Sequence, residues 1–396
     1  MRVLLVGGPF PLLSETFIVA HFRGLLARGV DVHYWGSEGD AWDAFPGLQG
    51  EARGRLHVHA PLEHPARTAR DLLAGAVHPR VLGAARGRPA DVARRLAAGA
   101  RVARLRPDLI HFEFGIAARE AMWMGDVARC PTVVSFRGYD LNYTGLDQPG
   151  YFDEVWRRAG VIHCLGEDLW QRAQRRGCPP GVRHALIPPA VDTARFAPRP
   201  DPASGGPLVI LTVARLHWKK GHVYGIQAVR ELVDAGVELE YRIVGTGPHG
   251  DAVHAAVHDL GLTDHVRLLG AVRHDGVRDE MRAADLLLHP AVSEGFGNAV
   301  MEAQAAGLPI VCTDADGLRE NVVDGETGFV VARRDPAALA AAITRLTDHE
   351  LRARMGVAGR RHVAESFQPE RQIDAFVELY EATLAGARQV GRTAAG

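Results

Sequence analysis

Short apolar runs rich in β-branched residues alternate along this chain with longer segments rich in alanine, leucine and arginine. Such alternation is typical of βαβ units, which build parallel sheets covered by helices. In the first half the runs predict strands at 2–7, 31–36, 55–59, 108–114, 132–137, 160–165 and 184–188. In the second half they predict strands at 208–213, 239–244, 266–270, 285–289, 309–313 and 328–332. The predicted fold class is therefore α/β, with two doubly wound, Rossmann-like domains facing each other across a cleft.

A stretch rich in proline and glycine separates the two series of strands. Five prolines between residues 188 and 202, followed by Ser204–Pro207, fit neither a helix nor a central strand. We therefore predict domains at 1–190 and 207–369, joined by a linker at 191–206. Apolar residues at three- and four-residue steps predict a C-terminal amphipathic helix within 370–396 that packs back onto the first domain.

Composition excludes several classes of protein. Lys and Arg total 46 against 47 for Asp and Glu, a formal net charge of −1, so we expect no nucleic-acid partner. The four cysteines stand singly, which favours neither a zinc cage nor a disulfide framework. No apolar run reaches the ~18 residues of a membrane span, and a strand-like run follows Met1 directly instead of a signal peptide. The expected location is the cytoplasm.

Residues 65–106 are strongly basic, with ten arginines and two aspartates. Two interpretations stay open. The segment is either a solvated helical face or a peripheral contact with an anionic surface, such as the inner face of the membrane or an anionic acceptor.

The most informative motif follows the predicted strand 285–289. Gly295, Gly297 and Asn298 form a turn into a helix, whose free N–H groups favour a phosphate or a carboxylate. Glu294 stands in the loop, and Glu302 shares a helix face with Asn298, so both could reach one ligand. The alternative is a capped helix with a solvated glutamate.

A second motif, Val213–Gly221, follows the first strand of the same domain. Arg215 leaves the strand end and Lys220 precedes a glycine that opens a helix, so both cations could point into one cleft and bind a diphosphate. Lys220 is expected to be exposed while the cleft is empty. Lys219 is expected to point elsewhere. By itself such a turn is more often a solvated loop.

Together these motifs resemble the donor domain of the retaining GT-B glycosyltransferases, specifically glycosyltransferase family 4. The matching positions are Val213–Leu216, Lys220–Gly221, Ile243–Pro248, Val266–Gly270, Ala284–Asp285, Glu294 with Glu302, Gly307–Pro309 and Glu320. The resemblance implies that Glu294 contacts the donor sugar, Glu302 the ribose, and Arg215 and Lys220 the diphosphate. It further implies nucleotide contacts at Gly8, Gly245, Gly270, Gly295, Phe296, Gly297 and Asn298. It implies no metal and no cofactor beyond a nucleoside-diphosphate sugar as co-substrate, with a UDP-sugar favoured.

The first half resembles the acceptor domain of the polysaccharide and natural-product branch of the same family. The resemblance rests on Gly7–Pro9, Ser14–Phe17, Ile110–Phe114 and Phe136–Asp140. Its candidate acceptor-side residues are Ser14, Glu15, Thr16, His111, Glu113, Arg137, Tyr139 and Asp140. Ser14 is also predicted to cap the helix that follows it.

One position departs from the family pattern. Many relatives have a histidine where this chain has Arg137, which suggests a changed acceptor or an arginine that neutralises the leaving phosphate. His111, at a strand end, could replace that histidine in part; a structural role is the alternative.

Two other signals carry less weight. Gly245–Gly250 matches a dinucleotide-binding pattern, but Pro248 lies inside the turn. His254 and His258 lack a third metal ligand nearby.

The predicted function is transfer of a hexose-type sugar from a nucleoside-diphosphate sugar to a hydroxyl, with retention of configuration. The acceptor is a glycan, a lipid-linked saccharide or a small natural product. The alternatives are a nucleotide-sugar epimerase or hydrolase, a phosphorylase with pyridoxal phosphate on a lysine, and a non-catalytic nucleotide-sugar-binding protein.

Overall fold

The computed structural model describes residues 1–58, 65–198 and 206–393. The chain divides into two compact units. The first contains Met1–Cys164, Trp170–Ile187 and Ile373–Gly396, and the second contains Leu165–Leu169 and Pro188–Gln372. The main division therefore falls at Pro188, and residues 199–205 of the predicted linker lie outside the described residues.

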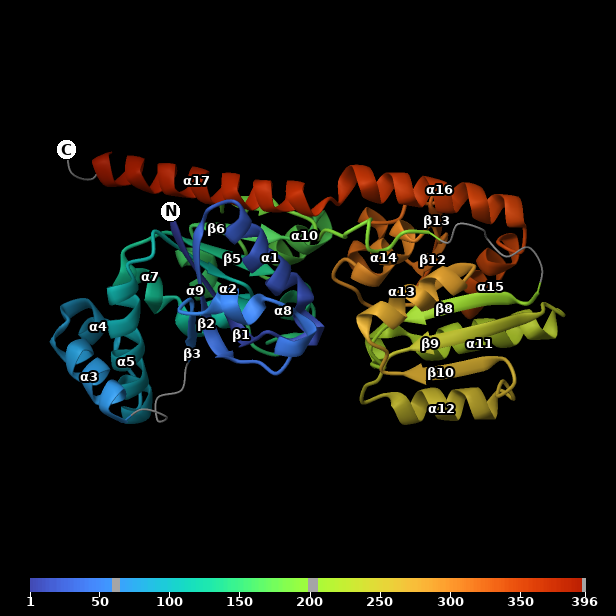
Figure 1. Ribbon diagram of the computed structural model, residues 1–396, viewed down its shortest axis with the longest axis horizontal. Helices are drawn as coiled ribbons and strands as arrows, with labels where there is room; N and C mark the ends of the chain where they lie inside the picture. Colours follow the sequence, from blue (N-terminus) through green and yellow to red (C-terminus); the bar gives the residue numbers. More distant parts are fainter. Residues whose placement is uncertain (59–64, 199–205, 394–396) are drawn as a thin grey trace. The chain divides into compact units, whose positions relative to one another are not determined.

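The first unit is built on a seven-stranded sheet, in which every pair of neighbouring strands is parallel (Figure 1). The strands, in spatial order, are β3 (Leu56–Val58), β2 (Asp31–Glu38), β1 (Arg2–Phe10), β4 (Leu109–Phe112), β5 (Thr132–Phe136), β6 (Val161–Cys164) and β7 (His184–Leu186). These strands lie where the apolar runs predicted them, because strands buried on both faces need continuous apolar sequence.

The helices of this unit lie between these strands along the chain, except the last one, which follows the second unit. They are α1 (Thr16–Ala27), α2 (Leu48–Ala52), α3 (Pro65–Val77), α4 (Pro79–Ala84), α5 (Pro89–Leu105), α6 (Gly115–Ala121), α7 (Trp123–Ala128), α8 (Tyr139–Tyr143), α9 (Asp153–Arg158), α10 (Glu167–Arg175) and α17 (Pro369–Thr393). Ile18, Phe22 and Leu25 of α1 share one core with Phe376 and Tyr380 of α17. The C-terminal helix is therefore part of the core of the first unit.

The start of α1 differs from the prediction for Ser14. The helix begins at Thr16 and its N-cap position is Glu15, which makes no side-chain capping hydrogen bond. Ser14 lies one residue before that position, in a short 3-10 turn at Leu13–Glu15. Its side chain lies outside the described residues.

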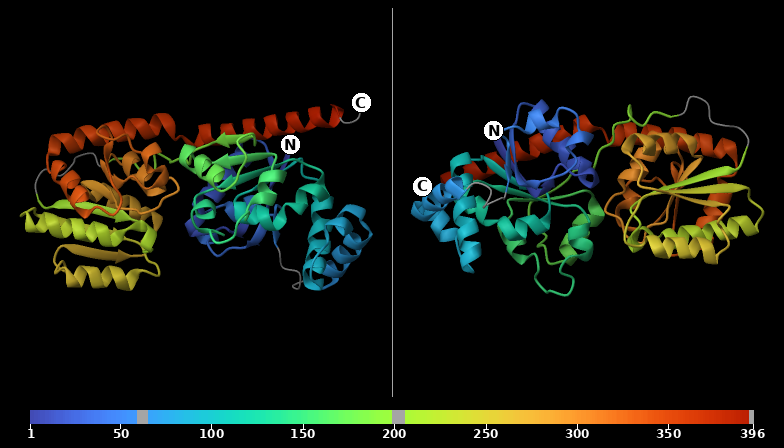
Figure 2. Two further views of the ribbon diagram at one scale, coloured as in Figure 1. Left: turned by 180° about the vertical axis from the view of Figure 1, so that it is seen from behind. Right: turned by 60° about the horizontal axis from the view of Figure 1, so that its bottom comes forward.

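The second unit is built on a six-stranded sheet, also parallel at every pairing. Its strands, in spatial order, are β10 (Val266–Gly270), β9 (Leu239–Val244), β8 (Leu208–Val213), β11 (Leu286–His289), β12 (Ile310–Thr313) and β13 (Gly328–Val331). Its helices are α11 (His222–Asp234), α12 (Gly250–Asp259), α13 (His274–Ala283), α14 (Asn298–Ala305), α15 (Pro336–Arg345) and α16 (His349–Ser366). Figure 2 shows α11 and α12 on one face of this sheet and α16 on the other.

Each sheet has one point at which the strand order reverses. In the first unit β1 lies between β2 and β4, and in the second β8 lies between β9 and β11. The connections that leave the two central strands there run to opposite faces and open a crevice at the carboxyl ends of the strands, which is where α/β sheets bind ligands. The loops after β1, β4, β8 and β11 carry most of the predicted site residues.

Among the residues that the structure describes, no helix is both long enough and apolar enough to cross a bilayer.

Candidate active site

The loops after β8 and β11 meet at the crevice of the second unit. The amide groups of Val292 and Ser293 donate to the carbonyl oxygen of Lys219 at 2.7 and 3.1 Å, which ties the two loops together. Gly221 follows with φ +67°, and a Cβ there would lie 1.9 Å from the carbonyl oxygen of Pro290. Only glycine fits this approach, so the lysine–glycine turn is set by backbone packing.

Lys220 and Glu294 form an ion pair at this point, and each side chain is only 14% exposed. Glu294 also accepts hydrogen bonds from Nε2 of His289 at 2.9 Å and from the amide of Gly295 at 3.0 Å. Burial alone would raise the pKa of Glu294, but the charge of Lys220 and the bond from His289 hold that pKa well below its ordinary value. The expectation that Lys220 is exposed is therefore wrong, because Glu294 holds its ammonium group.

His289 is a site residue that the sequence reasoning missed. It is buried at the end of β11, and burial lowers its pKa, so the ring is neutral and donates from Nε2 to Glu294. Its Nδ1 has no hydrogen-bond partner among the described residues. The available signal was a titratable residue as the last position of an otherwise apolar strand.

Asp316 holds the loop that carries Glu294 through hydrogen bonds. Its carboxylate accepts from the Ser293 hydroxyl and, at 3.0 Å, from the Glu294 amide, and its other oxygen lies 3.4 Å from Arg333. Asp314 accepts from the same arginine at 3.1 Å. These two carboxylates, which have metal-ligand spacing in the sequence, are thus already bonded within the protein.

Glu302 has an environment opposite to that of Glu294. It lies on α14, four residues after Asn298, and its carboxyl group makes no hydrogen bond or ion pair within the described residues. Burial raises its pKa to about 7, which Arg195 only partly offsets. One glutamate of the motif is therefore fixed as an anion by a lysine, and the other is held near half-protonation.

This difference predicts a pH-dependent effect of Glu302→Gln on stability. The pKa of Glu302 is about 7 in the folded chain against an ordinary value of 4.5, so the folded state loses stability as pH rises through that interval. At about pH 8 we expect Glu302→Gln to raise the free energy of unfolding by about 1–3 kcal/mol, and at about pH 5 to change it by less than about 1 kcal/mol. Urea denaturation at both pH values tests this. A gain of equal size at both would contradict the raised pKa.

The other predicted donor-side residues surround this pair. Arg215 is exposed, and Lys219 is half-buried, with its pKa lowered by burial and by the charge of Lys220. Phe296 is buried, Gly297 (φ +91°) precedes α14, and Asn298 begins the helix with an exposed side chain.

Gly245 and Gly270 shape the crevice from the neighbouring strands. The amide of Gly245 donates to the carbonyl of Gly270 at 2.8 Å. A Cβ on Gly245 would lie 2.0 Å from the carbonyl oxygen of Ala214, so this glycine allows the loop after β8 to pack closely.

In the first unit, Arg137 lies at the carboxyl end of β5 and bonds Glu113 at the end of β4. Its guanidinium donates to the Glu113 carboxylate and, at 3.2 Å, to the Glu113 carbonyl, and it stacks over Phe17 with its Cζ 4.4 Å from the ring centroid. Glu113 is fully buried, and a second bond, 2.8 Å from Nδ1 of His21, holds its other oxygen. Arg137 is therefore held in place by a buried carboxylate.

A chain of hydrogen bonds continues from His21 into the core. Nε2 of His21 lies 3.0 Å from the Tyr380 hydroxyl, which lies 2.6 Å from Nδ1 of His111. Nε2 of His111 lies 2.7 Å from the Ser135 hydroxyl, which lies 2.6 Å from Nδ1 of His163. Nε2 of His163 ends the chain at the carbonyl of Ile187, at 2.9 Å.

The carbonyl end fixes the direction of every proton in this chain. Burial lowers the pKa of His163 to about 3 and that of His111 well below its ordinary value, so both rings are neutral and each has one N–H. His163 donates to the carbonyl, Ser135 to His163, His111 to Ser135 and Tyr380 to His111. His21 must then donate from Nε2 to Tyr380, while its Nδ1 faces the Glu113 carboxylate.

His111 is therefore a structural residue. It has no exposed surface and both ring nitrogens are bonded inside the core. The expectation that it replaces the family histidine at an acceptor is wrong. The same bonds argue against a metal at His21, His111 and Glu113, which lie close enough to share an ion, because each of their ligand atoms already bonds a protein group.

The remaining acceptor-side candidates divide into buried and accessible groups. Asp140 is fully buried; its carboxylate accepts from the amide of Ile116 at 3.1 Å, and burial raises its pKa to about 6. It cannot contact a ligand directly. Glu15 and Thr16 are partly exposed at the start of α1, and Tyr139 is 58% exposed at the start of α8. Gly8, near the end of β1, has open space where a Cβ would lie.

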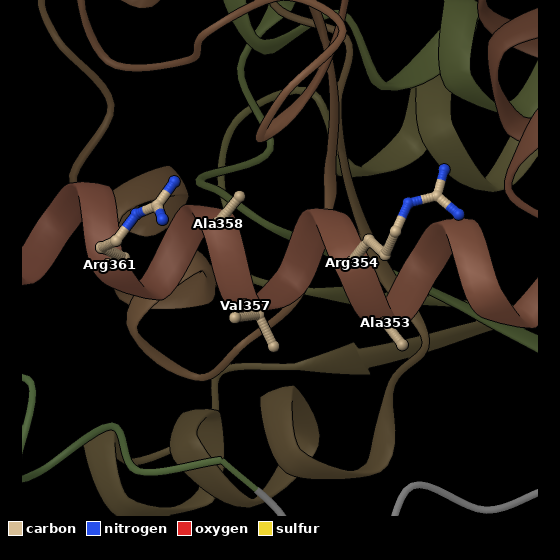
Figure 3. A pocket seen from close by; sticks show the side chains of 5 residues that line it. All are labelled: Ala353, Arg354, Val357, Ala358 and Arg361. Atoms are coloured by element: carbon tan, nitrogen blue, oxygen red, sulfur yellow. The ribbon is translucent and has the colours of Figure 1, made fainter.

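A hollow on α16 is no candidate site. Its lining side chains, shown in Figure 3, are Ala353, Arg354, Val357, Ala358 and Arg361. They come from one helix and offer no carboxylate, hydroxyl or imidazole for chemistry.

Comparison with known proteins places the second unit in a family. Residues 195–362 match the family model described as "Glycosyl transferases group 1". The chain is 30% identical over 392 residues to the "Putative colanic acid biosynthesis glycosyltransferase WcaL" of Salmonella typhimurium, covering 91% of this chain and 95% of that protein. It is 31% identical over 374 residues to the Escherichia coli protein of the same name, covering 86% and 90%.

Solved structures share the whole fold. The crystal structure of Anabaena Alr3699/HepE in complex with UDP superposes with a TM-score of 0.75 at 17% identity, covering 96% of this chain and all of that one. The same Anabaena protein in complex with UDP-glucose gives a TM-score of 0.74 at 18% identity, covering 96% of this chain and 99% of that one. The predicted fold class, GT-B with two Rossmann-like units, is thereby confirmed. The chain belongs to the group 1 glycosyl transferases.

Proposed function

We propose that the chain transfers a hexose-type sugar from a nucleoside-diphosphate sugar to a hydroxyl of its acceptor, with retention of anomeric configuration, as in glycosyltransferase family 4. The observation that carries the proposal is the Lys220–Glu294–His289 cluster beside the start of α14. A UDP-sugar is the favoured donor, because the Anabaena structures of the same fold contain UDP and UDP-glucose.

The chemistry depends on expelling the nucleoside diphosphate. Charge grows on the phosphate oxygens as the glycosidic bond breaks, and Lys220, Arg215 and the amides that begin α14 supply donors for it. Lys220 must first exchange its partner from Glu294 to the phosphate. Glu294 is then released to hydrogen-bond the hydroxyls of the sugar. Binding of the diphosphate to Lys220 thus also frees Glu294 for the sugar.

No protein nucleophile is needed in this mechanism. The acceptor oxygen attacks the anomeric carbon from the face that the diphosphate leaves. The bond between the anomeric carbon and the leaving phosphate oxygen breaks, and the acceptor proton passes to a phosphate oxygen. Positioning of the two substrates then supplies much of the rate. On the first unit, we propose that the acceptor binds Tyr139 and Thr16, which are exposed and partly exposed, and Arg137, whose side chain is 11% exposed. The proposed acceptor is a glycan, a lipid-linked saccharide or a small molecule.

A thermal-shift panel of uridine, guanosine, adenosine and thymidine diphosphate sugars, run in EDTA, tests the donor assignment. We expect the UDP-sugar to raise the melting temperature and the chelator to leave that rise unchanged, because the protein's own cations replace a divalent ion. A requirement for added Mg²⁺ or Mn²⁺ would contradict this and make Asp314 and Asp316 ligand candidates. Release of nucleotide without any acceptor would favour a hydrolase.

We also propose a peripheral contact with anionic membrane through α3 and α4. Leu73 and Val77, one turn apart on α3, are 71% and 82% exposed, and Arg70 and Arg80 stand exposed beside them in the chain. Part of the basic charge of this region is neutralised within the protein, because Arg101 and Arg104 bond the buried Asp71 at 2.7 and 3.0 Å.

Flotation with vesicles of phosphatidylglycerol tests this contact. The double variant Leu73→Ser/Val77→Ser is expected to lower the bound fraction severalfold, because it removes about 2 kcal/mol of apolar contact. Val357→Ser on α16 is the matched control, since Val357 is 73% exposed on another helix. If Leu73→Ser/Val77→Ser and Val357→Ser float equally, α3 faces solvent and does not contact the membrane.

A further inference from the structure

The edge of the first sheet at which the strands begin, opposite the candidate acceptor site, contains a second cavity of about 610 Å³. The cavity is open to solvent and is lined by four segments: the start of α4, the turn from α5 to β4, the turn from α7 to β5, and the last turns of α17. Its polar lining consists of His78, Arg80, Arg106, Asp108, Arg129 and Arg388. We refer to these six residues as the basic pocket.

Positive charge in the basic pocket is largely uncompensated. Within the described residues, none of its four guanidinium groups forms an ion pair or a hydrogen bond, whereas Arg2, Arg101 and Arg158 of the same unit all bond carboxylates. Its one carboxylate, Asp108, accepts at 2.6 Å from the backbone amide of Arg2. Nδ1 of His78 is buried without a partner in the described part of the protein. The four guanidinium groups are exposed to solvent, and their clustering around one cavity creates a positive potential that attracts an anion.

The backbone supplies a second, independent observation. Arg106 and Arg129 have φ values of +51° and +56°, in the left-handed region, at the C-terminal ends of α5 and α7. Glycine is the usual residue there, and a side chain costs about 1 kcal/mol or more. In the described chain only two other non-glycine residues, Asp316 and Arg334, have positive φ. An arginine elsewhere in the last turn would interact with the helix dipole without this strain.

We propose that the basic pocket binds a phosphate-bearing anion. Guanidinium groups match phosphate oxygens with paired hydrogen bonds, and the two strained arginines project their charge from adjacent turns into the same cavity. The volume suits a phosphorylated small molecule or headgroup, and Leu384 and Ala387 of α17 add an apolar wall. The phosphate comes either from a lipid headgroup or from a soluble phosphate ester.

The experiment compares Arg106→Gly/Arg129→Gly with Arg334→Gly in the full chain. Glycine relieves left-handed strain in both variants, so neither should melt below the wild type, and Arg334, at φ +63° in the other unit, is the matched control. Binding of inorganic pyrophosphate is measured by calorimetry with the donor site saturated by UDP, because the site proposed at Lys220 and Arg215 also binds a diphosphate. Flotation is measured with equimolar phosphatidylcholine and phosphatidylglycerol vesicles and with phosphatidylcholine alone. The double variant is expected to lose at least about tenfold in affinity, and the control nothing.

The calorimetry and the flotation together distinguish a lipid headgroup from a soluble phosphate ester. If the double variant loses binding to phosphatidylglycerol vesicles and Arg334→Gly keeps it, the phosphate belongs to a lipid headgroup. Loss of pyrophosphate binding, with no vesicle binding by the wild type, assigns a soluble phosphate ester. If the double variant binds both probes as tightly as Arg334→Gly, the basic pocket is not an anion site. Sugar transfer does not enter these measurements, so a basic pocket that binds neither probe leaves the proposed transfer unaffected, and the contact proposed for α3 and α4 keeps its own test in Leu73→Ser/Val77→Ser.

Discussion

Lys220→Ala is expected to lower kcat/KM for sugar transfer by about 10²–10³, the loss of ~3–4 kcal/mol that follows removal of one charged donor to a developing oxyanion. The variant also leaves Glu294 with only His289 and the Gly295 amide as partners. Because the ion pair is partly buried, a fall of a few degrees in melting temperature should accompany the loss. Turnover should therefore be measured well below the melting transition, alongside thermal denaturation.

Lys219→Ala is the control for this prediction. Lys219 has the same charge one position earlier and fixes the loops through its backbone carbonyl, which the substitution keeps. Its activity should fall less than about tenfold. If Lys219→Ala is inactive and Lys220→Ala is active, Lys219 rather than Lys220 binds the diphosphate. Lys220→Arg adds a charge control: activity near that of the wild type would show that charge alone suffices, whereas we expect the bulkier fork to fit poorly beside Glu294.

Glu294→Gln is expected to lower kcat by about 10–10² and to change the donor KM little, because orientation of the sugar matters most as the glycosidic bond breaks. The amide still accepts a hydrogen bond from His289 but no longer holds Lys220 as an ion pair or accepts from two sugar hydroxyls as a carboxylate does. Steady-state kinetics with the donor varied at a saturating acceptor concentration give both constants.

Glu302→Gln is the paired variant for Glu294→Gln. It should raise the donor KM by about tenfold with kcat within a few fold, since a ribose contact binds the ground state and the transition state alike. The two glutamates have opposite pKa shifts, so the sign of their stability effects should also differ near neutral pH: Glu294→Gln destabilises and Glu302→Gln stabilises. Equal kinetic effects confined to KM would contradict the assignment of Glu294 to the reacting sugar.

A compositional signal in the sequence adds weight to the lysine assignment. The whole chain contains only two lysines, Lys219 and Lys220, and uses arginine at all its other strongly basic positions. Lysine places a compact charge with three rotatable donors on a flexible stem, which suits a group that exchanges Glu294 for a phosphate. This usage distinguishes the turn from every other basic segment of the chain.

The sequence by itself determined the α/β class, every strand position to within a few residues, the C-terminal helix and the pair of motifs at the second crevice. These follow from local pattern: strands buried in parallel sheets need continuous apolar runs, and turns such as the one at Gly221 require glycine. Only the tertiary structure decided which polar groups share charge. It placed Lys220 on Glu294, added His289, buried His111 in a proton-ordered chain with Tyr380 some 269 residues away, and gave Glu294 and Glu302 opposite pKa shifts. The physical reason is that ionisation and accessibility depend on burial and on partners brought from distant segments, which a linear pattern of residues does not record.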